Sequence, residues 1–333
     1  MTAVAEFVAA ARRARETAPS RTIDVAPAGV GLRVNFAGAT VSEELPPGLL
    51  PADGAAQARA ELWAFDSDET GVAPPTPPWP TSAFQSGRPE IVGFSEPPRL
   101  AAYHHEHATL SFYDEDAAAG VQWFRSAKTM SPWEGGAPVR DLLRWSLAPH
   151  GAHLTHAATA GGVLLCGASG AGKSTTSLAC LLAGLPFTAD DYSVLTVEGD
   201  RVFSHAVYSH AKATPETMQL LPGLEEFAAG ARRDWRGKLR LPVAGRIARS
   251  QEVRAVVLPV LAEATGEPSP VDADEALRRV TAGNIAVMLG ATQRSFAAIA
   301  AVLERLPAYE LPCGPDPLEA AACIAELQVG SAA

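Results

Sequence analysis

Residues 167–174 carry the strongest chemical signal in the sequence. They read Gly-Ala-Ser-Gly-Ala-Gly-Lys-Ser and match the pattern GxxxxGK[ST] throughout. Glycine lets a backbone turn sharply enough for its N–H groups to face phosphate oxygens, and a following helix adds partial positive charge. We therefore expect a nucleoside triphosphate site, with Lys173 at the phosphates and Ser174 on Mg²⁺. The predicted nucleotide-binding residues are Gly167, Ser169, Gly170, Ala171, Gly172, Lys173, Ser174 and Thr175.

Two adjacent carboxylates form a second candidate group. Asp190 and Asp191 directly follow the strand-like segment 186–189. Beside a phosphate-binding loop, one carboxylate can hold Mg²⁺ while the other accepts the proton of an attacking hydroxyl. His156 lies one predicted strand upstream, among small apolar residues. A lone histidine in such a setting is ordinarily a core residue, so the residues alone leave its role open.

Two further clusters attract attention by composition. Residues 232–240 (RRDWRGKLR) are the densest basic segment of the chain. They can be a solvated loop, a loop that closes over phosphates, or a grip for an acidic peptide. His104-His105-Glu106-His107 looks like a metal site, but adjacent strand residues point to opposite faces and no third ligand is evident. We do not expect metal binding there.

The elements around these residues divide the chain near residue 135. Residues 1–135 read as a smaller, mostly β domain that is a candidate for substrate binding, and residues 136–333 as the catalytic domain. An apolar run at 162–166 predicts a strand buried on both faces, and a helix is expected from about Lys173 to Ala183. Further predicted strands are 29–36, 60–65, 108–113, 121–124, 154–158, 193–197, 201–206 and 253–260; further predicted helices are 138–147 and one that begins at Asp316.

Composition excludes several classes of protein. The chain has 333 residues, of which 47% are hydrophobic, so it can bury a large core. A formal net charge of −10 argues against a broad basic surface for nucleic acid. No run of about 18 apolar residues predicts a membrane helix, so we expect no membrane partner. The four cysteines lack CxxC spacing, which favours a reducing cytoplasm.

Three segments follow one another along the chain: His156-Ala157-Ala158, residues 167–174, and Ala189-Asp190-Asp191. Their order resembles that of the HPr kinase/phosphorylase superfamily, which shares its nucleotide fold with phosphoenolpyruvate carboxykinase. The resemblance covers about residues 130–328 and is greater to HPr-kinase-related serine kinases, including those that tailor lasso peptides. Segments 131–134 (SPWE), 138–140, 208–212 (YSHAK) and 307–311 add to it. The fold it implies is an α/β P-loop kinase core of the HPr kinase/carboxykinase type, preceded by the mostly β domain.

The resemblance also implies roles for individual residues. Asp190 becomes the general base, His156 lies against the carboxylates, and Asp191 joins Ser174 at Mg²⁺. Lys238 and Arg240 match a Lys-Arg pair of related kinases and become catalytic candidates with Lys173; Lys212 is a weaker one. Thr175 stands where the bifunctional HPr enzymes usually have Glu. We therefore expect neither HPr as the acceptor nor phosphorolysis.

The expected activity is ATP-dependent phosphorylation of a serine hydroxyl on a peptide or small protein, such as a ribosomal peptide precursor. A kinase for a small molecule such as free serine is one alternative, and a non-catalytic nucleotide-sensing module is another. A closed acceptor pocket would favour the first alternative. A module that only binds nucleotide has no need of a base such as Asp190. Related enzymes form oligomers, so the resemblance also allows a homo-oligomer.

Overall fold

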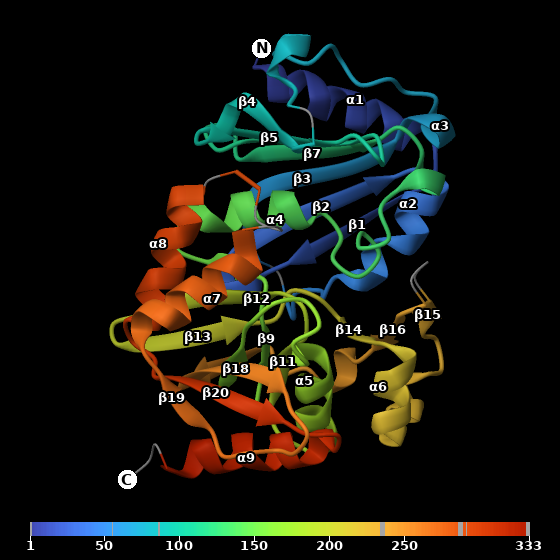
Figure 1. Ribbon diagram of the computed structural model, residues 1–333. Helices are drawn as coiled ribbons and strands as arrows, with labels where there is room; N and C mark the ends of the chain where they lie inside the picture. Colours follow the sequence, from blue (N-terminus) through green and yellow to red (C-terminus); the bar gives the residue numbers. More distant parts are fainter. Residues whose placement is uncertain are drawn as a thin grey trace. The chain divides into compact units, whose positions relative to one another are not determined.

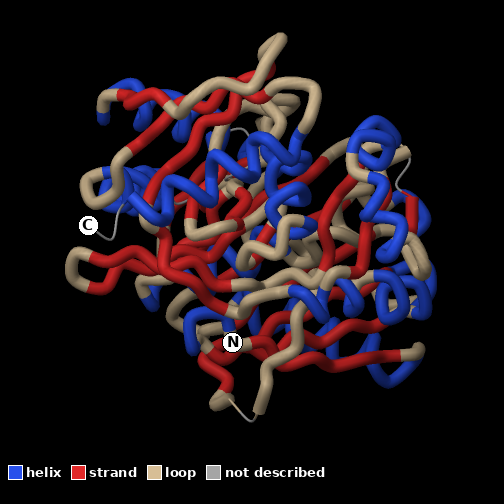
Figure 2. Tube along the Cα trace, turned by 90° about the horizontal axis from the view of Figure 1, so that it is seen from below, coloured by secondary structure: helices blue, strands red, loops and turns tan. Residues whose placement is uncertain are grey.

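The computed structural model describes residues 2–54, 56–85, 87–233, 237–285, 289–290 and 292–330. It confirms the α/β class, because helices lie between groups of strands along the chain and the two largest sheets contain both parallel and antiparallel pairs (Figures 1 and 2). The chain forms two compact units. Unit 1 comprises Met1–Ala152 and Met288–Arg294, and unit 2 comprises His153–Val287 and Ser295–Ala333.

Unit 1 is built around a seven-stranded sheet. In spatial order its strands are β1 (Ser20–Val25), β2 (Gly31–Ala37), β3 (Ala58–Asp66), β7 (Ala119–Phe124), β6 (Thr109–Asp114), β5 (Arg99–His104) and β4 (Glu90–Glu96). The pairs β2–β3 and β3–β7 are parallel, and the other pairs are antiparallel. The strands predicted at 29–36, 60–65, 108–113 and 121–124 are therefore present.

Helices cover both faces of this sheet within unit 1 (Figure 1). Helix α1 (Ala3–Thr17) buries a stripe of apolar side chains that packs with Val121 of β7. Gly120 precedes Val121 in β7 and therefore faces the opposite side of the sheet. A Cβ at Gly120 would meet Leu142 of helix α4 (Arg140–Leu147), so α4 covers that second face. The short helices α2 (Ala39–Glu44) and α3 (Ser67–Thr70) complete the helices described before α4.

Because α4 packs on β6 and β7, residues 136–152 belong to unit 1, and the compact units divide later in the chain than residue 135. The helix predicted at 138–147 begins two residues late. Val139 has a φ of +48°, outside the helical region, and so ends the preceding turn.

Unit 2 contains three sheets in its described part. The six-stranded sheet runs β11 (Phe187–Ala189), β9 (Ala158–Ala160), β10 (Val163–Leu165), β18 (Ala255–Leu261), β20 (Ala308–Cys313) and β19 (Ser269–Val271). The four-stranded sheet runs β17 (Ser250–Val253), β13 (Arg201–His205), β12 (Ser193–Glu198) and β8 (His153–Thr155). The three-stranded sheet runs β14 (His210–Ala213), β16 (Leu239–Pro242) and β15 (Arg232–Arg233).

The core of unit 2 lies between its six-stranded sheet and two helices. Strands β10, β18 and β20 are parallel, and the residues of β10 are no more than 1% exposed, as the apolar run predicted. Helices α5 (Lys173–Leu182) and α9 (Pro317–Gly330) pack on each other, and Leu178 and Ile324 lie in one apolar cluster with Leu165 and Val257. The remaining helices are α6 (Pro215–Leu220), α7 (Ala273–Ile285) and α8 (Thr292–Leu303).

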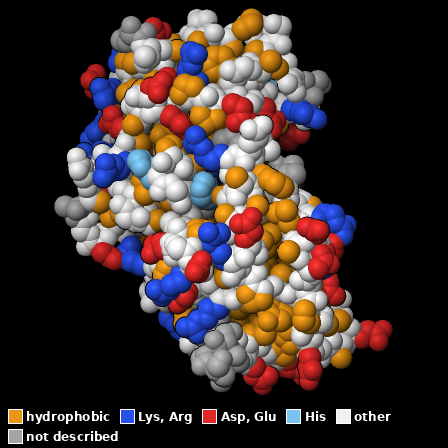
Figure 3. All heavy atoms as spheres, turned by 90° about the vertical axis from the view of Figure 1, so that its left-hand side faces the viewer, with side chains coloured by type: hydrophobic (Ala, Val, Ile, Leu, Met, Phe, Trp, Pro, Cys, Tyr) orange, Lys and Arg blue, Asp and Glu red, His pale blue; other side chains and the backbone are white. Residues whose placement is uncertain are grey.

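Two surface properties follow from the described residues. The face drawn in Figure 3 carries both acidic and basic side chains, with hydrophobic ones between them. No helix described in the structure has both the length and the apolarity to cross a membrane.

Candidate active site

The glycine-rich loop connects β10 to α5 in unit 2. Gly167, Gly170 and Gly172 have φ angles of +136°, +85° and +98°, where a side chain would be strained. Gly172 is the residue before the first turn of α5, and no side chain caps that end of the helix. The backbone N–H groups of the first turn are therefore not bonded by a capping side chain, as an anion site requires.

Lys173 begins α5 and folds back onto the loop. Its Nζ donates to the carbonyl oxygens of Gly167 at 2.8 Å and Ala168 at 3.0 Å. Only 7% of the residue is exposed, and this burial lowers the pKa of Lys173. The loop thus holds one nearly buried amine at its centre.

The other loop residues have different surroundings. Ser169 and Gly170 lie exposed, while Ala171 and Gly172 are partly buried. Ser174 is partly buried, and its hydroxyl is near enough to Asp190 to lower the pKa of that carboxyl. Thr175 is turned to another helix, because its hydroxyl lies 3.0 Å from the hydroxyl of Thr217 in α6.

Asp190 follows β11 and is 2% exposed. Its Oδ1 accepts from the Ser177 hydroxyl at 3.0 Å, and its Oδ2 accepts from the backbone N–H of Lys212 at 2.8 Å. Burial and then the nearby charge of Asp191 raise the pKa of Asp190, although its hydrogen bonds act in the opposite direction. The structure therefore provides a carboxylate with an increased affinity for a proton.

The surroundings of Asp191 lower its pKa, whereas those of Asp190 raise the pKa of that carboxyl. Its Oδ2 accepts from Lys212 Nζ at 2.6 Å, and its Oδ1 lies 3.2 Å from His156 Nε2. Burial opposes its ionisation, but the Lys212 charge and the His156 hydrogen bond outweigh burial, so the pKa of Asp191 is lowered. The two neighbouring carboxylates are thus separated in proton affinity, an arrangement typical of sites that divide acid–base and electrostatic work.

His156 lies in a turn rather than in a strand. The single strand predicted at 154–158 is wrong: β8 ends at Thr155, and β9 begins at Ala158. The turn forms because the N–H of His156 donates to Asn284 Oδ1 at 2.7 Å. Nδ1 of the ring lies 3.0 Å from the carbonyl oxygen of Gly283. Since both ring nitrogens face acceptors, both bonds form together only when each nitrogen carries a proton.

Helix α7 supplies two residues that sequence reasoning did not single out, Gly283 and Asn284. A Cβ at Gly283 would lie 2.9 Å from the Gly167 carbonyl oxygen, so only glycine allows this approach to the loop. Asn284 is 2% exposed and also donates to the Val280 carbonyl oxygen at 2.8 Å. The sequence signal that could have drawn attention to Gly283 and Asn284 is that two weak helix formers follow each other inside a helical pattern.

The basic segment reaches the same part of unit 2. Arg240 on β16 lies opposite Lys212 on β14, and the charge of Lys238 acts on Lys173. Arg232 and Arg233 form β15. Three residues of the segment, Asp234, Trp235 and Arg236, lie outside the described residues.

Oxygen donors are the ligands that Mg²⁺ prefers, and unit 2 offers them beside the loop. The Ser174 hydroxyl and the carboxylates of Asp190 and Asp191 form such a set. Their chemistry fits the ion, although both oxygens of Asp191 here face the cationic Lys212 and the ring of His156.

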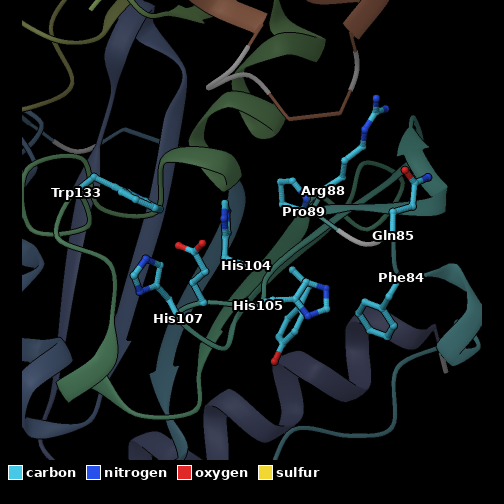
Figure 4. A pocket seen from close by; sticks show the side chains of 11 residues that line it. Phe84, Gln85, Arg88, Pro89, His104, His105, His107 and Trp133 are labelled. Atoms are coloured by element: carbon cyan, nitrogen blue, oxygen red, sulfur yellow. The ribbon is translucent and has the colours of Figure 1, made fainter.

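A separate cavity of about 610 Å³ lies in unit 1 (Figure 4). His104 ends β5, and His105 and His107 lie in the turn that follows, so the strand geometry assumed from the sequence does not apply to them. The lining residues are Phe84, Gln85, Gly87, Arg88, Pro89, Tyr103, His104, His105, Glu106, His107 and Trp133. No sequence pattern predicted this cavity, because its walls come from separate turns.

Comparisons with known proteins give a limited result. No family model and no curated protein matches the sequence. A structural comparison matches the Hpr(Ser) kinase/phosphatase from Coxiella burnetii, at 13% identity and a TM-score of 0.31, over 54% of this chain and 99% of that chain.

Proposed function

We propose that the protein is a phosphotransferase that moves the γ-phosphoryl group of ATP to a serine hydroxyl of a peptide or small protein. The observation that carries the proposal is the arrangement of the neighbouring carboxylates beside the loop: Asp190 accepts from Ser177 at 3.0 Å and from the Lys212 N–H at 2.8 Å, and Lys212 Nζ donates to Asp191 at 2.6 Å. The opposite directions of their pKa shifts agree with this arrangement. Asp190 also lies near the hydroxyl of Ser174, which directly follows Lys173 of the glycine-rich loop. A phosphoryl-transfer site needs these three parts together: a phosphate cradle, oxygen ligands for a metal, and a base.

The loop binds the donor in this proposal. The positive φ angles of its glycines and the uncapped start of α5 suit backbone N–H groups that hold phosphate oxygens. Lys173 exchanges its carbonyl partners for the phosphates, and its charge balances theirs.

Ser174 and Asp191 would hold Mg²⁺, with Asp190 beside Ser174. The ion supplies charge neutralisation for the β- and γ-phosphates. Lys212 and His156 keep Asp191 ionised and oriented, and binding of Mg²⁺ would require Asp191 to exchange one of these partners for the ion. Lys238 and Arg240 add positive charge near the loop and near Lys212.

Asp190 acts as the general base. In the transfer step, the acceptor oxygen forms a bond to the γ-phosphorus while the bond from that phosphorus to the β–γ bridging oxygen breaks. The serine proton passes to Asp190, and ADP leaves with the electron pair of the broken bond. A raised pKa suits this role, because a base is most effective when its pKa approaches the working pH.

The test uses the purified protein, Mg²⁺, γ-labelled ATP and an extract of its source cells. Label is separated into protein, peptide and small-molecule fractions. We expect Asp190→Asn to reduce label transfer by about 10²–10⁴-fold, because the base is lost. ATP affinity should stay within about threefold, because Asp190 does not hold the phosphates. Asp200→Asn, in the exposed β12–β13 hairpin, is the matched control and should retain transfer.

Each outcome has a defined meaning. Label in peptides or proteins that depends on Asp190 supports the proposal, and mass spectrometry then identifies the serine. Label only in small molecules replaces the proposal with a metabolite kinase. Tight ATP binding without transfer to any fraction contradicts a phosphotransferase and favours a nucleotide sensor.

A further inference from the structure

One buried amide of helix α7 has two different hydrogen-bond partners. Asn284 is 2% exposed; its Nδ2 donates to the Val280 carbonyl oxygen at 2.8 Å, and its Oδ1 accepts from the backbone N–H of His156 at 2.7 Å. An amide group has a donating end and an accepting end, so the bond to Val280 leaves the accepting end for His156. Asn284 therefore holds the main chain of His156 against α7.

The same helix also fixes the direction of the His156 ring. Nδ1 of the ring lies 3.0 Å from the carbonyl oxygen of Gly283, the residue before Asn284. With the main chain and one ring nitrogen held, Nε2 lies 3.2 Å from Asp191 Oδ1. The ring also contacts Tyr192, with centroids 5.3 Å apart and a tilt of 37°. Two contacts with α7 thus aim the ring at Asp191.

The part of α7 that holds His156 is packed against the glycine-rich loop. A Cβ at Gly283 would lie 2.9 Å from the carbonyl oxygen of Gly167, so the two main chains are in close contact there. Val280, one turn earlier in the helix, is 2% exposed. Because such close packing leaves little room for adjustment, α7 gives His156 a fixed support.

The side chain that depends on this orientation is Asp191. Its Oδ2 is held by Lys212 Nζ at 2.6 Å, and its Oδ1 is held by the ring of His156. One contact on each oxygen fixes the rotation of the carboxylate. Asp191 directly follows Asp190, the proposed base, and a misplacement of about 1 Å near the reacting groups can lower a rate by about 10²-fold. The direction of the His156 ring therefore bears on the rate.

We propose that Asn284 is a positioning residue for the transfer reaction, and that it acts through His156, whose ring it helps to aim at Asp191. This inference rests on the proposed function. In the described part of the chain the Asn284 side chain bonds Val280 and His156, so its influence on the carboxylates passes through His156. A purely structural role would instead make Asn284 a support of α7 alone.

The first experiment compares two replacements of similar size. Asn284→Leu removes the accepting oxygen, whereas Asn284→Asp keeps one. Initial rates in the labelled-ATP assay are measured over a series of ATP concentrations. We expect Asn284→Leu to lower the limiting rate by about 10–10²-fold, with the KM for ATP within about threefold, and Asn284→Asp to recover most of the rate.

Asn284→Ser is a second test variant in case leucine prevents folding. A serine hydroxyl in a helix can still donate to the carbonyl oxygen four residues earlier, here that of Val280. It is one bond shorter than the amide and loses the reach to His156. We expect the same fall in the limiting rate as for Asn284→Leu. Circular dichroism and thermal melting verify that each variant is folded.

A double-mutant cycle tests the route through His156. His156→Ala, Asn284→Leu and the variant with both changes are compared in the same assay. We expect the double variant to match His156→Ala within about threefold, because Asn284 has nothing left to aim once the ring is absent. Losses that multiply would show that Asn284 acts independently of the ring and would overturn the inference.

Arg279→Ala is the matched control on the same helix. Arg279 bonds Glu310 of β20 at 2.6 Å, so its loss removes one anchor of α7 without removing a bond of His156. We expect Arg279→Ala to keep the limiting rate within about twofold. Equal losses in Arg279→Ala and Asn284→Leu would assign the effect to the docking of α7 and overturn the inference.

The ring is also observed directly by nuclear magnetic resonance of the full chain with ¹⁵N-labelled histidine. The signals of His156 are those that disappear in His156→Ala. We expect both ring nitrogens of His156 to change their chemical shifts in Asn284→Leu and to keep them in Arg279→Ala, because only the first variant frees the ring. Unchanged signals in Asn284→Leu would contradict the proposed orientation by Asn284.

Failure of the proposed function gives a different pattern from failure of this inference. If the unmodified chain transfers label to no fraction, the phosphotransferase fails, and the positioning role in transfer fails with it even where the His156 signals shift. If the unmodified chain transfers label and Asn284→Leu does so at the same rate, the phosphotransferase stands and only the role of Asn284 is removed.

Discussion

Glu134 of unit 1 is 4% exposed, and its Oε1 accepts from Gln122 Nε2 at 3.1 Å. Its Oε2 has no hydrogen-bond partner in the described part of the chain. Burial raises the pKa of Glu134 to about 7. The charge of Arg140 lowers this pKa, the charge of Asp141 raises it, and the charge of His104 lowers it. The folded protein therefore holds this proton more tightly than the unfolded chain does.

The sign of the pH dependence follows from that difference. The stability from protonated Glu134 is fully present below its unfolded pKa of about 4.5, and it is lost as the pH rises through about 7. Glu134→Gln cannot ionise, so its unfolding free energy should rise relative to the unmodified protein between pH 5 and 8. The difference should approach a value on the order of 3 kcal/mol.

Urea unfolding at pH 5, 6, 7 and 8 measures this trend. The exposed Glu96→Gln is the control in the same unit and should give a pH-independent offset. A constant offset for Glu134→Gln as well would show that Glu134 does not titrate differently in the folded state.

At the candidate site, the parts that could be predicted from the sequence are those whose residues are close together in the chain. Residues 167–174 and the Asp190-Asp191 pair each lie in one short segment, so a motif reveals them. The hydrogen bond between Asn284 and His156 could not be predicted from the sequence, because the two residues are 128 positions apart and only the fold brings them together. Lys212 was ranked below Lys238 and Arg240, yet it bonds both aspartates directly, through its N–H and its Nζ.

Among the elements, helix α7 determines how closely another segment approaches the loop. Its Gly283 lies where a Cβ would meet the Gly167 carbonyl oxygen at 2.9 Å, and backbone atoms cannot move aside like a flexible side chain. In an exposed helix, Gly→Ala stabilises by about 1 kcal/mol. At this position the same change should destabilise the protein.

We therefore expect Gly283→Ala to lower the unfolding free energy by about 1–3 kcal/mol, the usual range for overpacking. ATP affinity should also fall, because Gly167 begins the loop. Thermal melting and nucleotide titration measure the two effects. Gly245→Ala is the control, since a Cβ there meets nothing within 4 Å. An increase in stability for Gly283→Ala would contradict the close packing of α7 on the loop.

The strands of the sequence were more predictable than the connections between them. Alternating and buried apolar runs located β2, β3, β6, β7, β10 and β18 closely. The break between β8 and β9 was missed because its cause, a hydrogen bond from His156 to Asn284, leaves no mark on local hydrophobicity. Strand β14 (His210–Ala213) likewise lacks a periodic signal in the sequence.

On the scale of the whole molecule, the chain crosses from one compact unit to the other more than once. Residues 288–294 belong to unit 1, although unit 2 lies on both sides of them in sequence. Within unit 1, Trp145 Nε1 donates to the Leu289 carbonyl oxygen at 2.8 Å, and Arg144 donates to the Gly290 carbonyl oxygen at 2.6 Å. Helix α4 thus holds this short segment in place.

Trp145→Phe should destabilise the protein by about 1–3 kcal/mol, because it leaves the buried Leu289 carbonyl without this donor. Trp79→Phe is a matched control. Trp79 is equally a buried residue of unit 1, but its Nε1 has no hydrogen-bond partner among the described residues. Chemical denaturation should therefore give the larger loss for Trp145→Phe; equal losses would mean that the hydrogen bond contributes no stability.

The interrupted course of unit 1 has a consequence for engineering the protein. A chimera that joins residues 1–152 of one homologue to the remainder of another would combine α4 from one parent with residues 288–294 from the other. The Trp145 and Arg144 hydrogen bonds would then join mismatched parents. Both acceptors are main-chain carbonyls, so these contacts depend on the path of the short segment rather than on its side chains; recombination breakpoints placed in pairs would keep that path and its donors in one parent.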